Sequence, residues 1–427
     1  MKSLDLGRYA SYACVVAALL AGCDGSHLPV AASGTMPQAR SRSTPAYQVL
    51  YRFGDHANPA HDLGGANPEG LLAVGDELYG TTGQGGNDSL GTVYSLSTAG
   101  VKKVLHRFGT GPSSSSDGVF PVGTLIKVKS LLYGATLIGG GCGSGSVYSI
   151  STSGTETILH SFCGASEGIQ PLAGLVNVNG TLYGTTQYGE STGNGGTVYS
   201  VTTGGAYKTV HNFTNSPNDG AEPAAPLLNV NGTLYGTTAY GGSGGFGTVY
   251  TIDAKGNEKV LYSFQGGYDA ARPFSGLINV NGTLYGTTLE GGTGRVGCSP
   301  SYAGCGTVYS ISTKGREKVL YSFGGFGTFG GDNGASPWAG VLEFNGVLYG
   351  TTSVGGTNGL GVIFSLTPSG SETVLHDFAG GTDGSQPFSE LIDVNGTLYG
   401  TTSQGGSTSG CKRFGGSGCG TVFTLTP

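Results

Sequence analysis

One pattern recurs seven times along the 427 residues of the chain: Leu-Tyr-Gly-Thr-Thr, a glycine-rich stretch, then Gly-Thr-Val-Tyr-Ser or a close variant. The tyrosines of the first motif lie 50 to 54 residues apart, except for one interval of 64; they are Tyr79, Tyr133, Tyr183, Tyr235, Tyr285, Tyr349 and Tyr399. A period of this length with strand-like segments is typical of propellers and repeat arrays. The repeat therefore constrains the fold more than any other feature of the sequence.

Each repeat contains four short runs rich in Val, Thr, Tyr and Phe, for example 276–280, 283–288, 306–312 and 317–323. In the last of these, Val319, Tyr321 and Phe323 alternate with other side chains, which is the period of a β-strand. Five repeats place Asn-Gly between the first two runs, and this pair favours a type I′ hairpin turn. The pattern predicts four antiparallel strands per repeat.

A glycine interrupts the second run of every repeat: Gly80, Gly134, Gly184, Gly236, Gly286, Gly350 and Gly400. Glycine weakens a strand unless another backbone or an aromatic ring must approach it closely. The sequence predicts such an approach, and we expect adjacent blades to supply it.

The phase of the repeat indicates how the array ends. The first strand-like run, 47–53, has the character of a fourth run, and the chain finishes with a third run, 420–427. Pairing the two removes both exposed edges. The sequence thus predicts an all-β, seven-bladed β-propeller with four-stranded blades, closed by pairing the N-terminal strand with the C-terminal blade; a solenoid is the alternative.

These motifs resemble kelch-like propellers in blade layout and, more closely, the "GloVer"-type tandem repeats of choice-of-anchor bacterial surface proteins. The closer resemblance covers about 47–427, through Leu-Tyr-Gly-Thr-Thr, a Gly-Gly pair such as Gly291-Gly292, and Gly-Thr-Val-Tyr or Gly-Thr-Val-Phe. It implies an exported tandem-repeat protein held by an anchor. It brings no established catalytic residues.

The N-terminus has the features of an export signal. Lys2 and Arg8 precede an apolar run, 13–20, which is too short to span a bilayer. Leu-Ala-Gly-Cys follows and resembles a lipobox, so Cys23 is the expected lipid attachment site and the membrane is contacted through this anchor only. An ordinary secretory signal is the alternative.

The expected domain organisation is a lipoprotein signal peptide (1–22), a lipidated flexible tether (23–45) and the propeller (46–427). Ser, Pro, Ala and Gly dominate the tether. The expected location is extracytoplasmic, as a membrane-anchored bacterial lipoprotein in the periplasm or at the cell surface.

Six cysteines remain besides Cys14 and Cys23, an even number that suits an oxidising compartment. Their positions predict the disulfides Cys142–Cys163, Cys298–Cys305 and Cys411–Cys419. Cysteines six or seven residues apart without nearby histidines do not match zinc spacing. We therefore expect no metal and no cofactor.

Composition excludes one class of partner. Charged residues make up 11% of the chain and its net charge is −6, so it offers no basic face for nucleic acid. We expect a monomer whose partner is a glycan or an extracytoplasmic protein.

The connections between the second and third strands, and between blades, share one face and contain every long insertion. Variable loops on a rigid scaffold are where binding usually resides. Aromatic side chains beside hydrogen-bonding groups suit a sugar ring or an extended peptide. The candidate ligand-binding residues are Tyr188, Tyr240, Arg295, Tyr302, Trp338, Arg413 and Phe414. Packing between blades is the alternative role for each aromatic residue.

Acidic residues recur in the connection between blades: Asp117, Glu167, Asp219 and Asp383, with Asp269 and Asp332 in variant forms. Six acids around one pore could gather cations, but Asp before Gly ordinarily closes a turn, and this second role is favoured. His106, His160, His211 and His376 stand where other repeats have tyrosine, which indicates aromatic packing.

The sequence has no His-Glu-x-x-His motif and no phosphate loop. His56 and His61, beside Asp55 and Asp62, form the one unrepeated His-Asp cluster. We therefore expect a non-enzymatic binding or adhesion module. A structural envelope scaffold and a polysaccharide-acting hydrolase or lyase are the alternatives.

Overall fold

The computed structural model describes residues 45–54, 64–86, 88–109, 117–189, 195–293, 304–324, 331–407, 411 and 418–427. The chain divides into two compact units, Met1–Ser43 and Thr44–Pro427, and every described residue belongs to the second. Within these ranges no helix has the length and apolar character needed to cross a membrane.

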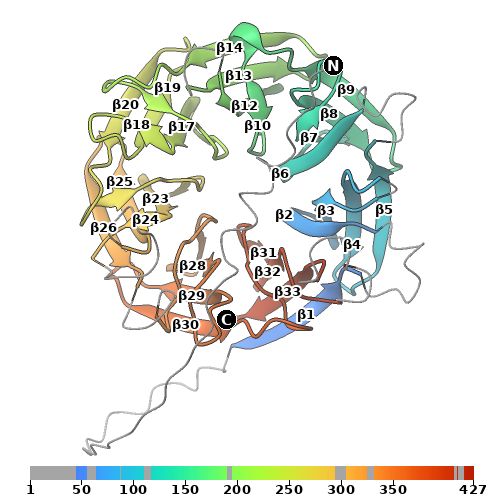
Figure 1. Ribbon diagram of the computed structural model, residues 1–427, viewed down its shortest axis with the longest axis vertical. Helices are drawn as coiled ribbons and strands as arrows, with labels where there is room; N and C mark the ends of the chain where they lie inside the picture. Colours follow the sequence, from blue (N-terminus) through green and yellow to red (C-terminus); the bar gives the residue numbers. More distant parts are fainter. Residues whose placement is uncertain are drawn as a thin grey trace, which may run out of the picture. The chain divides into compact units, whose positions relative to one another are not determined.

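The second unit is built from seven four-stranded antiparallel blades arranged in a ring, with the first strand of each blade nearest the centre (Figure 1). From inner to outer strand, blade 1 contains β2 (Ala66–Val74), β3 (Glu77–Gln84), β4 (Thr92–Ser97) and β5 (Lys102–Arg107). Blade 2 contains β6 (Gly118–Val128), β7 (Leu131–Gly139), β8 (Ser146–Ser151) and β9 (Glu156–Ser161). Blade 3 contains β10 (Ile169–Pro171) with β11 (Val176–Val178), then β12 (Thr181–Tyr188), β13 (Thr197–Thr202) and β14 (Tyr207–Asn212).

Blades 4 to 6 follow the same order. They are β16 (Leu228–Val230), β17 (Thr233–Thr238), β19 (Thr248–Ile252) and β20 (Glu258–Ser263); β22 (Ile278–Val280), β23 (Thr283–Thr288), β25 (Thr307–Ser312) and β26 (Glu317–Ser322); and β27 (Leu342–Phe344), β28 (Val347–Thr352), β29 (Val362–Leu366) and β30 (Glu372–Asp377). Short pairs extend blades 4 and 5: β15 (Gly220–Ala221) with β18 (Tyr240–Gly241), and β21 (Ala270–Ala271) with β24 (Glu290–Gly291). A 3-10 helix, η3 (Ala165–Glu167), precedes β10.

Blade 7 combines the two ends of the repeat region. It contains β31 (Ile392–Val394), β32 (Thr397–Thr402), β33 (Thr421–Thr426) and, as its outer strand, β1 (Ala46–Arg52). β1 pairs with β33 from Ala46 opposite Thr426 to Arg52 opposite Thr421. The predicted closure of the ring is confirmed.

The same aromatic contact joins each blade to the next. A phenylalanine just after the outer strand packs nearly edge-to-face on the Tyr or Phe of the next blade's third strand, with centroids 4.9 to 5.5 Å apart. The pairs are Phe108–Tyr148, Phe162–Tyr199, Phe213–Tyr250, Phe264–Tyr309, Phe323–Phe364, Phe378–Phe423 and, across the closure, Phe53–Tyr94. These rings form the centre of the apolar clusters between blades.

The mid-strand glycines accommodate these rings, as the close approach predicted from the sequence requires. A Cβ added at Gly184 would lie 2.4 Å from the hydroxyl oxygen of Tyr199, which is directly opposite on the next strand. The expectation that adjacent blades supply the contact is wrong, because the ring comes from the same blade. Its other partner, the phenylalanine, belongs to the preceding blade.

The two threonines of Leu-Tyr-Gly-Thr-Thr have separate roles. The second shares a hydrogen bond of 2.8 Å with the hydroxyl that opens the third strand, as between Thr238 and Thr248. The first donates to a carbonyl of the next blade, as from Thr287 to Ala339 at 2.8 Å. In these blades one threonine therefore bonds within its own blade and the other bonds to its neighbour; in blade 6 Val362 replaces the hydroxyl, and Thr351 Oγ1 has no hydrogen bond.

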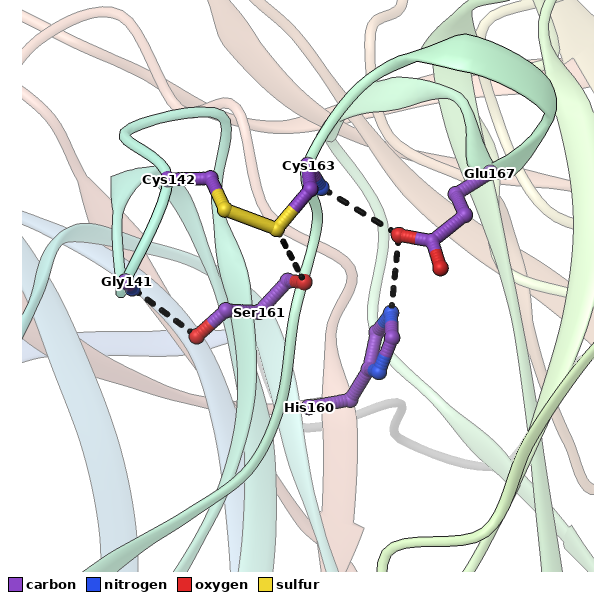
Figure 2. Close-up of a disulfide and its surroundings, with 6 residues drawn as sticks. All are labelled: Gly141, Cys142, His160, Ser161, Cys163 and Glu167. Carbon is purple, nitrogen blue, oxygen red and sulfur yellow. Dashed lines mark hydrogen bonds and ion pairs between the residues drawn. A yellow bond between two sulfur atoms is a disulfide. The ribbon is translucent and has the colours of Figure 1, made fainter.

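Disulfides fasten the loops. Cys142 and Cys163 are bonded with Cα atoms 4.9 Å apart (Figure 2), and Cys411 and Cys419 with Cα atoms 5.5 Å apart. Both predicted pairs are confirmed. Cys305 is also disulfide-bonded, while its predicted partner Cys298 lies outside the described residues.

We predict opposite effects from two substitutions at one contact. The buried hydroxyl of Tyr199 forms no hydrogen bond, and blade 6 has Phe364 at this position, so Tyr199→Phe should be neutral or stabilise the fold by up to about 1 kcal/mol. Gly184→Ala should destabilise it by about 2–3 kcal/mol, because the added methyl overlaps the ring. Urea unfolding measures both. Equal losses of stability in the two variants would show that the Tyr199 side chain does not pack on Gly184.

Candidate functional site

Every blade has one residue with a strained backbone in the segment that leads into its inner strand; we call this segment the inner loop. The residue before the proline at the start of each inner strand is not glycine, yet its φ lies between 52° and 58°: Asn67, Phe120, Gln170, Glu222, Arg272, Ser336 and Gln386. Such a conformation costs on the order of 1–3 kcal/mol and persists only where the surroundings enforce it. Each of these residues donates its N–H to a carbonyl of the preceding blade at 2.7 to 2.9 Å.

The following proline packs on a glycine of the preceding blade. A Cβ added to Gly247 would lie 2.8 Å from the Cδ atom of Pro273, and the ring closure repeats this contact between Gly420 and Pro68 at 2.5 Å. The hydrogen bond and the proline together fix the backbone of each inner loop. The side chains on either side of the proline can therefore differ from blade to blade without changing the loop.

Arg272 is the centre of a group of interacting side chains at the loop-rich end of blades 4 and 5. Its guanidinium Nη1 donates to Glu290 Oε1 at 3.0 Å, and Nη2 donates to the hydroxyl of Tyr240. The guanidinium carbon also lies 4.9 Å from the ring centroid of Tyr240 and 5.6 Å from that of Phe274. Arg272 thus links a carboxylate to two aromatic rings.

The aromatic series continues across the next two blades. Phe274 packs on Trp338 with centroids 5.2 Å apart, and Trp338 packs on Phe388 at 5.7 Å. Each of the three residues directly follows the proline of its own blade, and Phe388 remains 41% exposed. We call Tyr240, Arg272, Phe274, Glu290, Trp338 and Phe388 the inner cluster.

Polar groups lie at the blade 3 side of the inner cluster. Gln187 Nε2 donates to Glu222 Oε2 at 3.2 Å. Burial raises the pKa of Glu222, while Gln187 and the positive charge of Arg272 act in the opposite direction. Burial likewise raises the pKa of Glu290 against the effect of Arg272.

Glu390 adds a carboxylate from blade 7. It occupies the position that is glycine in blades 5 and 6, and its Oε1 lies 2.5 Å from where a Cβ of Gly340 would stand. Glycine at that position therefore leaves room for the Glu390 side chain. Burial raises the pKa of Glu390, although the N–H of Gly340 lowers it. Acceptors and aromatic faces thus occur together on the inner loops.

Two of the ligand-binding residues predicted from the sequence lie together in the structure, and several others lie outside the described residues. Tyr240 and Trp338 belong to the inner cluster, and Tyr188 is half-buried at the end of β12, in the position equivalent to Tyr240. The predicted residues Arg295, Tyr302, Arg413 and Phe414, and the lipid attachment site Cys23, lie outside the described residues.

Sequence reasoning missed Arg272, Phe274, Glu290 and Phe388. The proline of each repeat is the signal that could have identified three of them, because it marks the start of every inner strand. Aligning the repeats on that proline places Arg272 directly before it, and Phe274 and Phe388 directly after it.

The Gloeobacter/Verrucomicrobia repeat matches residues 31–195, 113–299 and 298–427 of the sequence. The chain belongs to this family. No curated protein matches it at a significant level. The repeat of the Gloeobacter/Verrucomicrobia family therefore corresponds to propeller blades in this protein.

Solved structures are similar to this chain at low sequence identity. Puromycin hydrolase is 12% identical with a TM-score of 0.50; the match covers 83% of this chain and 52% of the hydrolase, so this chain spans about half of its length. A computationally designed protein, Ika8, is 12% identical with a TM-score of 0.46, covering 89% of this chain and all of Ika8. A gluconolactonase from Xanthomonas campestris is 11% identical with a TM-score of 0.41, covering 90% and 89%.

The acidic residues between blades of this Gloeobacter/Verrucomicrobia repeat protein close turns. Asp219 Oδ2 accepts from the backbone N–H of Thr214 at 2.8 Å, and Asp383 and Asp269 accept equivalent bonds at 2.8 Å. The favoured turn-closing role is thus confirmed for these residues. They do not line a central pore, however, because their side chains contact residues of the outer strands.

The histidines pack as aromatic groups, as their positions in the repeat predict. The ring of His160 stacks on Tyr207 of the next blade with centroids 4.0 Å apart, and His376 stacks on Tyr47 at 3.5 Å. Figure 2 shows His160 pointing toward Glu167, with 3.4 Å between Nε2 and Oε2, beside the Cys142–Cys163 disulfide. Three side chains therefore meet between consecutive blades: one from the outer strand of the first blade, an acid or amide from the connection, and one from the outer strand of the next blade. We call this group an interblade triad.

We predict that the interblade triads containing Glu317 and Glu372 lower the free energy of unfolding as the pH rises. Burial and the charge of Asp269 raise the pKa of Glu317 to about 7, and burial raises that of Glu372 to about 6, from an ordinary value of 4.5. The folded state therefore binds more protons than the unfolded state between these values, and the free energy of unfolding falls from pH 5 to pH 8. Glu317→Gln with Glu372→Gln should flatten this slope.

The measurement is the urea midpoint at each pH for the parent and the double variant. His160 acts in the opposite direction, because burial lowers its pKa against the pull of Glu167, but it is the same in both proteins. Parallel curves for parent and variant would contradict the prediction.

Proposed function

We propose that this protein is a non-enzymatic, extracytoplasmic binding module that takes up a glycan at the inner cluster. The observation that carries the proposal is the continuous series from Tyr240 and Arg272 through Phe274 and Trp338 to the exposed ring of Phe388. It spans four blades on the face with the long loops. Single exposed aromatic residues are common on proteins, whereas such a series with polar neighbours is suited to recognition.

The chemistry of the cluster matches a sugar better than a wholly apolar ligand. A pyranose ring has an apolar face that stacks on an aromatic side chain and a rim of hydroxyl groups that need donors and acceptors. Glu290 and Glu222 supply acceptors and Arg272 supplies donors, and Glu390, two residues after Phe388 in the sequence, adds a further carboxylate. Most of these groups already bond to each other, so the site is held in shape before a ligand arrives.

The proposed location follows from the N-terminal sequence and the disulfides. The lipobox-like segment ending at Cys23 supports export and lipid attachment. The bonds Cys142–Cys163 and Cys411–Cys419 support an oxidising compartment. The protein then acts as a monomeric, membrane-anchored lipoprotein in the periplasm or at the cell surface.

A glycan panel with matched variants tests the function. The parent should bind one or a few glycans saturably, and Trp338→Ala and Phe388→Ala should each weaken that binding by at least about tenfold, since a buried aromatic contact contributes about 1.5 kcal/mol or more. Tyr268→Ala is the control, because Tyr268 is 81% exposed on the turn after β20, outside the cluster, and should be dispensable. Far-ultraviolet circular dichroism confirms that each variant is folded.

Other outcomes would remove this function. Silence across the panel, combined with recovery of one stable protein partner by cross-linking in cells, would replace it with the role of an envelope scaffold. Release of shortened sugars from a bound polysaccharide would make the protein a hydrolase or lyase. Binding that survives both cluster substitutions would place the ligand elsewhere on the molecule.

A further inference from the structure

The interblade triad between blades 1 and 2 combines an imidazole with two carboxylates. His106 comes from the outer strand β5, Asp117 from the connection to the next blade, and Glu156 from the outer strand β9. One ligand atom of each residue lies within 4.8 Å of the others. His106 Nε2 is 3.5 Å from Asp117 Oδ2, which is about the separation of two ligands bound to one zinc ion at roughly 2.1 Å each.

All three residues of this triad have a polar atom that is buried without a hydrogen bond. These atoms are His106 Nε2, Asp117 Oδ1 and Glu156 Oε1. Asp117 is only 9% exposed, and its other oxygen accepts the N–H of Gly109 at 3.0 Å. Buried polar atoms are normally satisfied, so three together indicate a missing partner. That partner must accept electron pairs from a nitrogen and two oxygens at once.

Other interblade triads contain a tyrosine hydroxyl that donates a hydrogen bond, although His160 Nε2 and one oxygen each of Glu317 and Glu372 are also buried there without a hydrogen bond. Tyr262 takes the place of the histidine and donates to Asp269 at 3.0 Å. Tyr207 and Tyr47 take the place of Glu156 and donate to the backbone carbonyls of Glu167 and Asp383. Where a phenol is present, a proton donor fills the space. The blade 1–2 triad has two carboxylates and an imidazole instead.

We propose that His106, Asp117 and Glu156 bind a divalent transition-metal ion between blades 1 and 2. A neutral imidazole nitrogen and two carboxylate oxygens are suitable ligands for zinc or manganese. The buried carboxylate of Asp117 and the half-buried one of Glu156 together can balance the charge of a divalent ion. Three protein ligands leave a coordination position for water. The ion would join the outer strands of the two blades, as a disulfide joins loops elsewhere in the molecule.

A second triad with the same residue types provides an internal comparison. His211, Asp219 and Glu258 also place their ligand atoms within 4.8 Å of one another. The Asp219 carboxylate, however, already accepts bonds from His211, from the backbone and hydroxyl of Thr214 and from the N–H of Gly220. Its hydrogen-bonding capacity is used within the fold, so we expect this triad to bind no ion or to bind it much more weakly.

Zinc binding by the full chain tests the proposal. The chelator-treated protein is dialysed against Zn²⁺, and the bound metal is counted by elemental analysis. His106→Tyr is the decisive variant, because tyrosine occupies this position in blades 4 and 5 as Tyr262 and Tyr321 and should preserve packing. His211→Tyr is the matched control. Any zinc held by other groups of the chain is retained in both variants.

The parent should bind one equivalent more than His106→Tyr, and His211→Tyr should bind as much as the parent. Glu156→Gln, which keeps the shape of the side chain, should lose the same equivalent. Zn²⁺ should also raise the thermal unfolding midpoint of the parent but not of His106→Tyr, since an ion that binds only the folded state stabilises it. Equal zinc content in the parent and His106→Tyr would overturn the proposal, as would no bound zinc in either.

Discussion

The edge-to-face aromatic contact between consecutive blades is the interaction on which the rest of this fold depends. It recurs at all seven boundaries, including the closing one between Phe53 and Tyr94. Each contact contributes on the order of 0.5–1.5 kcal/mol beyond the burial of the rings. The glycine in each second strand follows from it, because only a residue without a Cβ leaves room for the ring. The glycine-rich composition is thus a consequence of aromatic packing and of the turns, and the chain has no need of a single central core.

Much of the fold could be predicted because the repeat shows the same local physics seven times. Alternation predicted the strands, and the phase of 47–53 against 420–427 predicted the closure that β1 and β33 form. The positions of Cys142 and Cys163 on either side of one strand hairpin predicted their disulfide, and the loop bracketed by Cys411 and Cys419 predicted the other. The prediction that an adjacent blade supplies the aromatic ring above each glycine was wrong. A strand pattern does not distinguish an aromatic residue of the same sheet from one of the next sheet. The inner cluster was found only in part, because its contacts, such as those of Phe274 with Arg272 and Trp338, depend on how the blades are arranged and not on a local sequence pattern.

The buried positions of a blade and the position before its proline differ in how much the amino acid varies from one blade to the next. The buried face repeats with few changes, whereas the residue at positive φ before the proline is Asn, Phe, Gln, Glu, Arg or Ser. Neighbouring blades hold that backbone through one hydrogen bond and the proline–glycine contact, so the loop conformation does not require a particular side chain there. The interblade triads behave similarly, since histidine, tyrosine and carboxylate side chains replace one another around a constant turn. The same scaffold can thus present different chemistry at each boundary.

The closing strand also determines how the ring responds to mechanical load. A force directed along β1 would load the six positions that it pairs with β33 together, instead of opening them one at a time. Tyr47 adds lateral contacts, through its stack on His376 and its hydroxyl bond to the Asp383 carbonyl. Such shear loading is the geometry in which a β-structure withstands force best. The strand that closes the ring would therefore share such a load with the blade in which it pairs.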